Sequence, residues 1–584
     1  MVQKKTTKKK PVAKKSAAKK PAANSQKPWL KSYPKGIDWN APIDTTPVFE
    51  TVLKSCDKHG DRVAIDFLGA TTSYASLGSQ IRAMAGALQK DYGIKKGSRV
   101  AIMLPNTPFF PVAYYAVLLC GGTVVNCNPL YSSNELSHII GNSGADLLIT
   151  LDLTVVFEKA EKLMERGDVK KAIVGHFPDV LSGIKKILFS LLKGKELSKW
   201  QSGKYASQIE SFASLVDKGL SARPVKIDAD KDVAVQQYTG GTTGAPKGAM
   251  LSHANIAANL SQIQIWGCGL FEPPAKVVAV LPFFHIFAMT VCMNVPLSRG
   301  ASIILLPRFE MKMMLALLKR TRADILPAVP TLTLALANAP EATRELLSSI
   351  KVVISGGAAL PDETRAAFAK KSDALLAEGY GLTETSPVVC CAALNEPSKP
   401  MSIGLPVPGT DIRFVDIEDP SKFMPLGERG ELVVKGKQVM LGYFNNEQAN
   451  KEAFTKGWFR TGDVGYMDDD GYSFLVDRIK DIIICSGFNV YPRAIEEAIY
   501  KHEAVDEVTV IGVKDDYRGE APIAFIKLLA GKTLKEEEMK EFLKEHLSKI
   551  EMPKSVFFKD ELPKTLVGKL SKKELREEYA ATHS

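Results

Sequence analysis

A loop rich in glycine and threonine is the segment whose residue types most clearly suggest chemistry. It reads Tyr238-Thr-Gly-Gly-Thr-Thr-Gly-Ala-Pro-Lys-Gly248 and lies between the apolar run 233–235 and a helical pattern over 252–263. Backbone N–H groups, threonine hydroxyls and the Lys247 ammonium are donors that suit phosphate oxygens. A Walker A motif is excluded, because it needs Ser or Thr after its lysine and Gly248 stands there. The sequence therefore predicts a different phosphate-binding loop between a strand and a helix.

Six further motifs follow this loop along the chain. They are Pro282-Phe-Phe-His-Ile286, Gly356-Gly-Ala-Ala359, Glu378-Gly-Tyr-Gly-Leu-Thr-Glu-Thr-Ser386, Gly457-Trp-Phe-Arg-Thr-Gly-Asp463, Asp477-Arg-Ile-Lys-Asp481 and Pro563-Lys-Thr-Leu-Val-Gly-Lys569. In type and order the seven motifs resemble those of the adenylate-forming superfamily, which includes acyl-CoA synthetases, luciferases and peptide-synthetase adenylation domains. The form of the loop and the segment 281–288 look most like bacterial long-chain fatty-acid–CoA ligases.

The resemblance implies a two-step reaction that makes an acyl-CoA. A fatty-acid carboxylate attacks the α-phosphate of ATP to give acyl-AMP and pyrophosphate, and the thiol of CoA then displaces AMP. Fatty acid, ATP and CoA are the expected small-molecule partners, and Mg²⁺ is the expected metal. The residues that the resemblance assigns to nucleotide binding are Thr239, Gly240, Gly241, Thr242, Thr243, Gly244, Lys247, Gly357, Ala358, Gly379, Tyr380, Gly381, Thr383, Asp463, Arg478 and Lys569.

The resemblance gives three residues catalytic roles. Lys569 would bridge the carboxylate and the α-phosphate and reduce charge repulsion in the transition state. Glu384 would hold Mg²⁺ through a hard carboxylate oxygen, and Thr383 would bond the α-phosphate. Without the resemblance, Glu384 is interpreted as a solvated turn carboxylate and Lys569 as one more solvated lysine.

The nucleoside part of ATP is assigned to a second group of residues. Tyr380 would stack on adenine, and Asp463, an acceptor when ionised, would bond the ribose diol. Arg478 would donate to ribose or phosphate oxygens. The alternatives are that Tyr380 is a core tyrosine and that Asp463 and Arg478 form a structural ion pair at a domain seam.

The acyl chain is expected to enter an apolar tunnel. The residues expected to line the tunnel are Phe284, His285, Ala288, Gly356 and Gly357. Amino-acid-activating relatives usually place an aspartate just after the phenylalanine of this motif, whereas His285 follows Phe284 here. Each buried CH₂ group of the ligand would contribute about 0.8 kcal/mol. His285 either gates the tunnel or satisfies a polar bond in the core, and both interpretations stay open.

A second pose of the C-terminal region is implied, because the CoA thiol must reach the carbonyl that Lys569 covers in the first step. Lys480 matches the hinge position of the superfamily. Ser486 and Gly487, in the segment 485–491, would then move in to line the channel for CoA. Cys485 is expected to be a packed thiol rather than a nucleophile.

The elements that must position these residues alternate between strand and helix, over a chain of 584 residues that is long enough for several compact units. Strands are expected over 99–104, 123–126, 146–150, 277–281, 301–305, 323–328 and 350–355, and helices over 113–119, 133–142 and 311–320. The pattern predicts an α/β fold, with a large N-terminal domain of layered sheets over 37–477 and a β-rich subdomain over about 403–476. Residues 478–584 predict a small, mobile α+β domain with its hinge near Lys480.

The net charge of +11 belongs to one end of the chain. Residues 1–35 hold twelve lysines and no acidic residue, so the remainder has 64 basic and 65 acidic side chains and a net charge of −1. Residues 1–36 are therefore expected to form a disordered Lys/Ala/Pro tail. A nucleic-acid-binding face on the folded body is not supported, and DNA binding through the tail is retained only as a remote alternative.

A second basic segment, 181–192, has apolar residues at helical spacing and lysines on its polar side. Leu181, Ile184, Leu188 and Leu191 would form the apolar face. A basic amphipathic helix can lie in an anionic lipid interface. Peripheral attachment to the cytoplasmic face of a membrane is therefore one interpretation, and packing of the same face on the protein body is the other.

Cysteine usage and the N-terminus favour a cytoplasmic location. The eight cysteines form no CxxC pair, and no apolar segment typical of a signal peptide follows the N-terminal lysines. The uncharged stretch between Arg99 and Glu135 is interrupted by Pro105, Pro108 and Pro111, so it predicts a buried helix and strand rather than a membrane span.

Two questions remain open at the level of the sequence. The rival enzyme interpretation is a fatty-acyl-AMP ligase or adenylation enzyme that passes the acyl group to a carrier protein. No Asp-Ser-Leu carrier site follows residue 569, which favours CoA as the acceptor. A homodimer is compatible with the sequence and is not specified by it.

Overall fold

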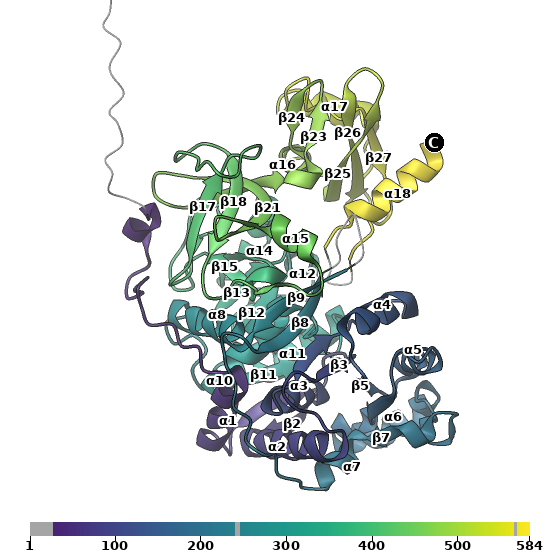
Figure 1. Cartoon of the computed structure of the whole chain (residues 1–584). Coiled ribbons are helices and arrows are strands. Elements are labelled where there is room, and N and C mark those ends of the chain that lie inside the picture. The colour runs from purple at the N-terminus through teal and green to yellow at the C-terminus, as the bar shows by residue number, and fades with distance from the viewer. Residues whose placement is uncertain (1–26, 240–245, 566–568, 584) are drawn as a thin grey trace, which may run out of the picture.

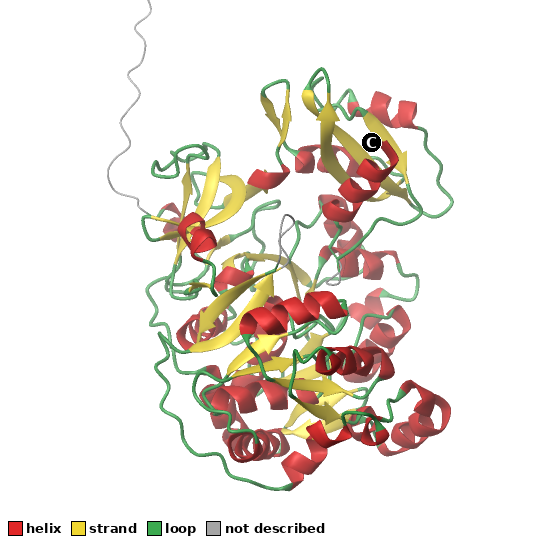
Figure 2. Ribbon diagram, turned by 45° about the vertical axis from the view of Figure 1, so that its right-hand side comes forward, coloured by secondary structure: helices red, strands yellow, loops and turns green. Residues whose placement is uncertain are grey.

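The computed structural model describes residues 27–239, 246–565 and 569–583 of the chain. Two large sheets, a smaller β-rich sheet and a C-terminal domain account for the described strands (Figure 1). Helices cover the faces of both large sheets, as Figure 2 shows in red against the yellow strands. One continuous hydrophobic core joins the two large sheets and the β-rich sheet. The predicted α/β fold class is therefore confirmed.

The first large sheet has nine strands in the described part of the chain. In spatial order they are β16 (Leu405–Pro406), β15 (Val388–Cys391), β14 (Leu375–Gly381), β13 (Val352–Gly356), β12 (Ile325–Ala328), β10 (Lys276–Ala279), β11 (Ser302–Leu305), β1 (Val63–Phe67) and β2 (Ala70–Ser73). Strands β14 through β1 pair in parallel, and antiparallel strands close both edges. Strands β11, β12 and β13 are wholly buried, as expected for parallel strands covered by helices on both faces.

The second large sheet has eight strands among the described residues. They are β19 (Gly442–Tyr443), β9 (Lys247–Ser252), β8 (Val233–Thr239), β4 (Thr123–Asn126), β3 (Arg99–Ile102), β5 (Leu147–Leu151), β6 (Lys171–Gly175) and β7 (Ile209–Ser211). The expected order of helix and strand over 99–150 is confirmed within one to four residues at each boundary. The prediction agrees with the structure here because these elements depend on local signals. Apolar runs and helix caps such as Ser132 are both visible in the sequence.

Fourteen helices precede the β-rich sheet in the described residues. They are α1 (Val48–Lys58), α2 (Tyr74–Asp91), α3 (Phe109–Leu119), α4 (Ser133–Ser143), α5 (Thr154–Glu165), α6 (Gly183–Lys193), α7 (Phe212–Asp217), α8 (His253–Trp266), α9 (Ile286–Ala288), α10 (Val295–Arg299), α11 (Met311–Thr321), α12 (Pro330–Asn338), α13 (Arg344–Leu347) and α14 (Asp362–Ala369). Helix α3 is buried and β4 follows it, as expected for the uncharged stretch. Among the residues described, no helix combines the length and the apolar character needed to cross a membrane.

The glycine- and threonine-rich loop connects two strands and not a strand and a helix, which corrects the sequence prediction. Strand β9 follows β8 as an antiparallel hairpin, and α8 begins only at His253. The sequence did not reveal β9 because Lys247 and Gly248, at its start, are typical of loops. The predicted site residues Gly240, Gly241, Thr242, Thr243 and Gly244 lie outside the described residues.

The β-rich sheet comprises β17 (Asp411–Val415), β18 (Gly430–Lys435), β21 (Trp458–Met467), β20 (Phe454–Thr455) and β22 (Ser473–Arg478), with α15 (Glu447–Ala453) beside it. Two strands within the segment 403–476, β16 and β19, join the two large sheets and not the β-rich sheet. β16 and β19 have two residues each, which is too short for a sequence pattern from which their pairing could be predicted.

The C-terminal domain lies apart from the two large sheets, at the top of Figure 1. It has its own small hydrophobic cores. Its elements are β23 (Ile483–Cys485), β24 (Phe488–Val490), α16 (Pro492–Tyr500), β25 (Val505–Asp515), β26 (Gly519–Leu528), α17 (Glu536–Leu543), β27 (Ser555–Phe558) and α18 (Lys572–His583). The strand order is β24-β23-β26-β25, with β27 paired to β26. The expected mixture of helices and strands is confirmed.

The N-terminal segment shows that part of the tail prediction is wrong. Residues 1–26 lie outside the described residues, but the helical turn η1 (Pro28–Ser32) packs on the turn between β21 and β22. Trp29 is buried and packs so closely on Gly471 that a Cβ added to Gly471 would lie 2.2 Å from the Cα of Trp29. A single tryptophan among lysines and prolines gave no periodic signal from which this contact could be predicted.

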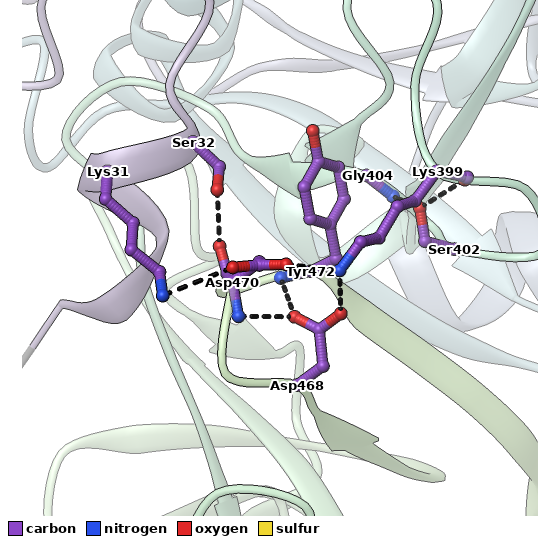
Figure 3. Close-up of polar contacts among 8 residues, drawn as sticks. All are labelled: Lys31, Ser32, Lys399, Ser402, Gly404, Asp468, Asp470 and Tyr472. Carbon is purple, nitrogen blue, oxygen red and sulfur yellow. Dashed lines mark hydrogen bonds and ion pairs between the residues drawn. The ribbon is translucent and has the colours of Figure 1, made fainter.

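Polar contacts hold the same turn in place (Figure 3). The Ser32 hydroxyl donates to the carbonyl of Asp470 at 2.8 Å, and Lys31 lies 3.2 Å from the Asp470 carboxylate. Lys399 bridges Asp468 at 2.5 Å and Asp470 at 2.7 Å. The segment after Lys27 is therefore part of the folded body.

Candidate active site

A cavity of about 1130 Å³ collects most of the described residues that the sequence assigned to the nucleotide. Residues of the two large sheets, the β-rich sheet and the C-terminal domain all line it. Those assigned in advance are Thr239, Lys247, Phe284, His285, Gly356, Gly357, Gly379, Tyr380, Gly381, Thr383, Glu384, Arg478, Lys480 and Lys569. The sequence motifs, spread over more than three hundred residues, therefore converge on one space.

Lys569 reaches this cavity from the C-terminal domain. A Cβ on Gly357 would lie 3.1 Å from the Cε of Lys569, so the lysine side chain rests against the backbone of the large domain. The loop that carries it is closed by two bonds to Thr565, whose N–H donates to the Lys569 carbonyl at 2.6 Å and whose hydroxyl accepts from the Lys569 N–H at 3.1 Å. Burial, with a smaller contribution from Arg478, lowers the pKa of Lys569 to about 8.

Asp463 connects two of the residues assigned to the nucleoside. The Tyr380 hydroxyl donates to Asp463 Oδ2 at 2.6 Å, and Arg478 Nε donates to Asp463 Oδ1 at 2.7 Å. Asp463 and Arg478 face each other across β21 and β22. Burial and then Asp463 raise the pKa of Tyr380 well above its usual range, so its hydroxyl remains a donor. The ion pair that the sequence left as an alternative is therefore present in the structure.

Glu384 and Lys247 line another part of the cavity. The Tyr443 hydroxyl donates to Glu384 Oε1 at 2.7 Å, and Glu384 is buried. Lys247 Nζ lies 5.3 Å from the centroid of the Tyr443 ring. Burial and then Glu384 raise the pKa of Tyr443 above its usual range. A carboxylate and a lysine thus face the same part of the cavity.

The motif 282–286 is held in place by buried amides. Asn106 Oδ1 accepts from the Phe283 N–H at 2.8 Å, and Gln237 Nε2 donates to the Phe284 carbonyl at 2.8 Å. His285 Nδ1 accepts from the Phe287 N–H at 3.4 Å, so the neutral ring carries its proton on Nε2. Burial, followed by Lys569, lowers the pKa of His285 to about 3.

A second cavity of about 1390 Å³ lies next to the first, and Phe284 and Leu130 line both. Its other lining residues are mostly apolar, among them Leu181, Leu188, Phe189, Leu192, Val280, Leu281, Met313, Val329, Leu332 and Ala335. Phe284 and Leu130 therefore stand where a polar cavity meets an apolar one.

The remaining assigned residues lie elsewhere. Ala288 is buried in α9 and is not among the residues lining these two cavities. Ala358 is exposed beside Gly357. Ser486 and Gly487 are exposed on the β23–β24 hairpin of the C-terminal domain. Cys485 is buried, as expected for a packed thiol.

The sequence analysis missed two residues that hold the site together. Glu431 accepts from Arg460 Nε at 2.9 Å and from the Gly462 N–H at 3.0 Å, which fixes the strand just before Asp463. Tyr443 is the donor to Glu384. Tyr443 stands 59 positions after Glu384, and no local pattern links residues so far apart. Glu431 follows the turn Gly427-Glu-Arg-Gly430, which likewise carries no information about its partner.

Comparison with known families shows matches over both domains. The AMP-binding enzyme family matches residues 52–444, and the AMP-binding enzyme C-terminal domain matches residues 494–569. The chain belongs to the AMP-binding enzyme family. This AMP-binding enzyme is 40% identical to the long-chain-fatty-acid–CoA ligase of Bacillus subtilis (strain 168), over 96% of this chain and 99% of that protein. It is 37% identical to the long-chain-fatty-acid–CoA ligase of Yersinia pestis, over 95% and 98% of the two chains.

Solved structures show the same fold. ATP-bound MatB from Rhodopseudomonas palustris matches this AMP-binding enzyme with a TM-score of 0.80 and 29% identity, over 92% of this chain and 99% of MatB. The comparison covers the large and the small domain together. The family and the ATP-bound structure support the use of ATP by this AMP-binding enzyme.

Proposed function

We propose that this AMP-binding enzyme is a long-chain fatty-acid–CoA ligase, which forms acyl-AMP from a fatty acid and ATP and then transfers the acyl group to CoA. The position of Lys569 carries the proposal, because a lysine of the small domain lies against Gly357 inside the cavity of the large domain. Two curated relatives are named long-chain-fatty-acid–CoA ligase.

In the first half-reaction, a carboxylate must approach the α-phosphate although both groups are negative. The ammonium group of Lys569 offsets this repulsion where the negative charge develops. Arg478 adds a second cation and stays paired with Asp463. Each oxygen of the Asp463 carboxylate accepts one bond and has a second lone pair, so it can still accept from the ribose hydroxyls.

Mg²⁺ fits the donors near Glu384. This ion takes one or two protein carboxylates and completes its shell with phosphate oxygens and water. When bound, it neutralises negative charge on the phosphates. Tyr443 orients the Glu384 carboxylate, and Lys247 supplies a further cation on the same side. Thr383, next to Glu384 in the cavity lining, is the donor proposed for the α-phosphate.

We assign the acyl chain to the second cavity, with its carboxylate near Phe284. The lining is mainly aliphatic and aromatic, and each methylene buried there contributes about 0.8 kcal/mol. The locally bonded His285 lines only the polar cavity. In this arrangement Phe284 and Leu130 border the passage between the reacting carboxylate and the chain.

The second half-reaction requires the small domain to turn about Lys480, which lies in the helical turn η8 (Ile479–Asp481) after β22 and lines the cavity. The β23–β24 hairpin exposes Ile484 and Phe488 in this pose, at 57% and 60% of their surfaces. If the hairpin turns toward the cavity with Ser486 and Gly487, Ile484 and Phe488 can become buried against the large domain. We propose that this hairpin lines the CoA channel and that the domain boundary lies at residues 477–478.

We also propose a peripheral contact of the enzyme with the cytoplasmic face of an anionic membrane. Helix α6 has no buried residue, and Ile184 and Leu191 are 84% and 77% exposed. Leu188 and Leu192 on the same helix line the acyl cavity. Lys185, Lys186 and Lys193 lie beside these apolar groups, as lysines do in lipid-bound amphipathic helices. Lys186 is paired with Asp179 and Lys193 with Glu196. The protein body therefore leaves Ile184 and Leu191 uncovered, while Leu181 packs against the core.

The proposed activity is tested with the purified full-length chain by measuring pyrophosphate release. Saturated fatty acids of increasing length and a set of aromatic acids are compared, with and without CoA. Long-chain acids are expected to give the fastest release, and repeated turnover is expected only with CoA. Faster release with aromatic acids would overturn the assigned substrate. Turnover that needs an acyl carrier protein instead of CoA would favour the rival adenylation enzyme.

A further inference from the structure

Helix α16, the first helix of the C-terminal domain, is bonded directly to the large domain. Arg493 Nη1 donates to the Leu475 carbonyl at 3.0 Å, and the Arg493 N–H donates to Asp477 Oδ2 at 2.9 Å. Leu475 and Asp477 belong to β22, which is part of the β-rich sheet of the large domain. One residue thus makes two polar bonds across the domain seam.

A second contact lies next to the first. The Arg429 guanidinium lies 5.1 Å from the centroid of the Tyr491 ring, within the range of a cation–π interaction. Arg429 belongs to the large domain, and Tyr491 precedes α16 directly. The charge of Arg493 also acts across the seam, since burial raises the pKa of Glu378 on β14 while Arg365 and Arg493 lower it.

The seam contacts join residues that lie on opposite sides of the proposed pivot in the sequence. Leu475 and Asp477 precede the proposed pivot at Lys480, whereas Tyr491 and Arg493 follow it. A rotation of the small domain about this pivot must separate donors from acceptors. The structure holds the seam contacts together with the pose in which Lys569 lies against Gly357, and such a rotation would break them.

We propose that Arg493 is a positioning residue that holds the small domain in the adenylation pose. It does not touch the reacting atoms, and its effect reaches them through the placement of Lys569. This inference rests on the proposed two-step function. Arg493 would then set the balance between the two poses, with loss of its side-chain bond to the Leu475 carbonyl favouring the pose for thioester formation.

The two half-reactions, measured separately, test the proposal with Arg493→Ala. Acyl-AMP formation without CoA is expected to fall about tenfold, the scale of a lost hydrogen bond from a charged donor. Thioester formation from supplied acyl-AMP and CoA is expected to stay unchanged or to rise. Arg493→Lys, which keeps one cationic donor, is expected to recover part of the adenylation rate.

Glu497→Gln is the matched control, because Glu497 accepts from Arg493 Nε at 2.9 Å within α16 and makes no seam contact among the bonds described. It is expected to leave both half-reactions unchanged. Equal losses in both half-reactions of Arg493→Ala, or no loss in either, would overturn the proposal. Inactivity of the wild-type chain toward every fatty acid would instead count against the proposed function.

Tryptic cleavage near the pivot gives a readout that needs no substrate. Arg478 and Lys480 are trypsin sites beside the seam, and a freer small domain exposes them more often. Arg493→Ala is expected to be cut there faster than the wild type, while Glu497→Gln is cut at the wild-type rate. Identical cleavage rates for all three chains would contradict the proposed positioning role of Arg493, whatever the substrate of the enzyme is.

Discussion

Lys569 of the C-terminal domain lies against Gly357 of the large domain, with its Cε 3.1 Å from the position that a Cβ on Gly357 would occupy. The two residues stand 212 positions apart in the sequence, and in the proposed function their contact belongs to the adenylation pose. Gly357 has a φ of +84°, which disfavours any other residue at this site.

Gly357→Ala is therefore expected to slow acyl-AMP formation more than thioester formation. The new Cβ would strain the left-handed backbone by about 1–2 kcal/mol and press on the Lys569 side chain. Single-turnover assays of each half-reaction give the measurement. Gly531→Ala is the control, because Gly531 has a φ of +79° and its new Cβ would have no neighbouring atom within 4 Å. An equal slowing of both half-reactions by Gly357→Ala would show that Lys569 is not displaced.

Lys480→Pro is expected to give a different phenotype. A proline fixes φ at the pivot, so adenylation in the present pose should survive while the rotation for thioester formation fails. Acyl-AMP should accumulate on the variant when fatty acid and ATP are supplied together with CoA. An overall rate equal to that of the wild type would show that the backbone at Lys480 does not turn.

Proton uptake on ATP binding tests the electrostatics of Lys569. With a pKa of about 8, this lysine is mostly neutral at pH 9 and mostly charged at pH 7. Bound phosphates favour the charged form, so ATP binding at pH 9 should take up a proton, and this uptake should disappear toward pH 7. Titration calorimetry in buffers of different ionisation enthalpy measures it. Lys569→Ala should lose the uptake at pH 9, and a variant that retains it would assign the proton to another group.

Helix α6 is expected to bind anionic vesicles. Leu188→Glu places a charge on the apolar face and should reduce co-sedimentation at low salt, with a further loss when residues 2–28 are deleted. Residues 2–26 of that deletion lie outside the described part of the chain. Neutral vesicles and high salt should weaken binding of the wild type, because screening reduces the attraction of its lysines. If wild type, Leu188→Glu and the deletion all pellet equally, neither element binds the membrane.

The sequence predicted those parts of the molecule that depend on local patterns. Apolar runs identified β3, β4 and β5, and the motifs identified Lys569, Glu384, Asp463 and Arg478, which all lie in or beside one cavity. It did not predict contacts between distant segments, such as the bond from Tyr443 to Glu384 or the packing of Trp29 on Gly471. Strand β9 was also missed, because its pairing with β8 overrides the loop character of Lys247 and Gly248.

The most direct test of the central claim measures both half-reactions of Lys569→Ala. The account predicts that acyl-AMP formation falls by about 10²–10³ or more, because an oriented charge at the transition state is lost. Thioester formation from supplied acyl-AMP and CoA should remain close to the wild-type rate, since Lys569 acts only in the first pose. An equal loss in both half-reactions would contradict the account, as would an adenylation rate that does not change.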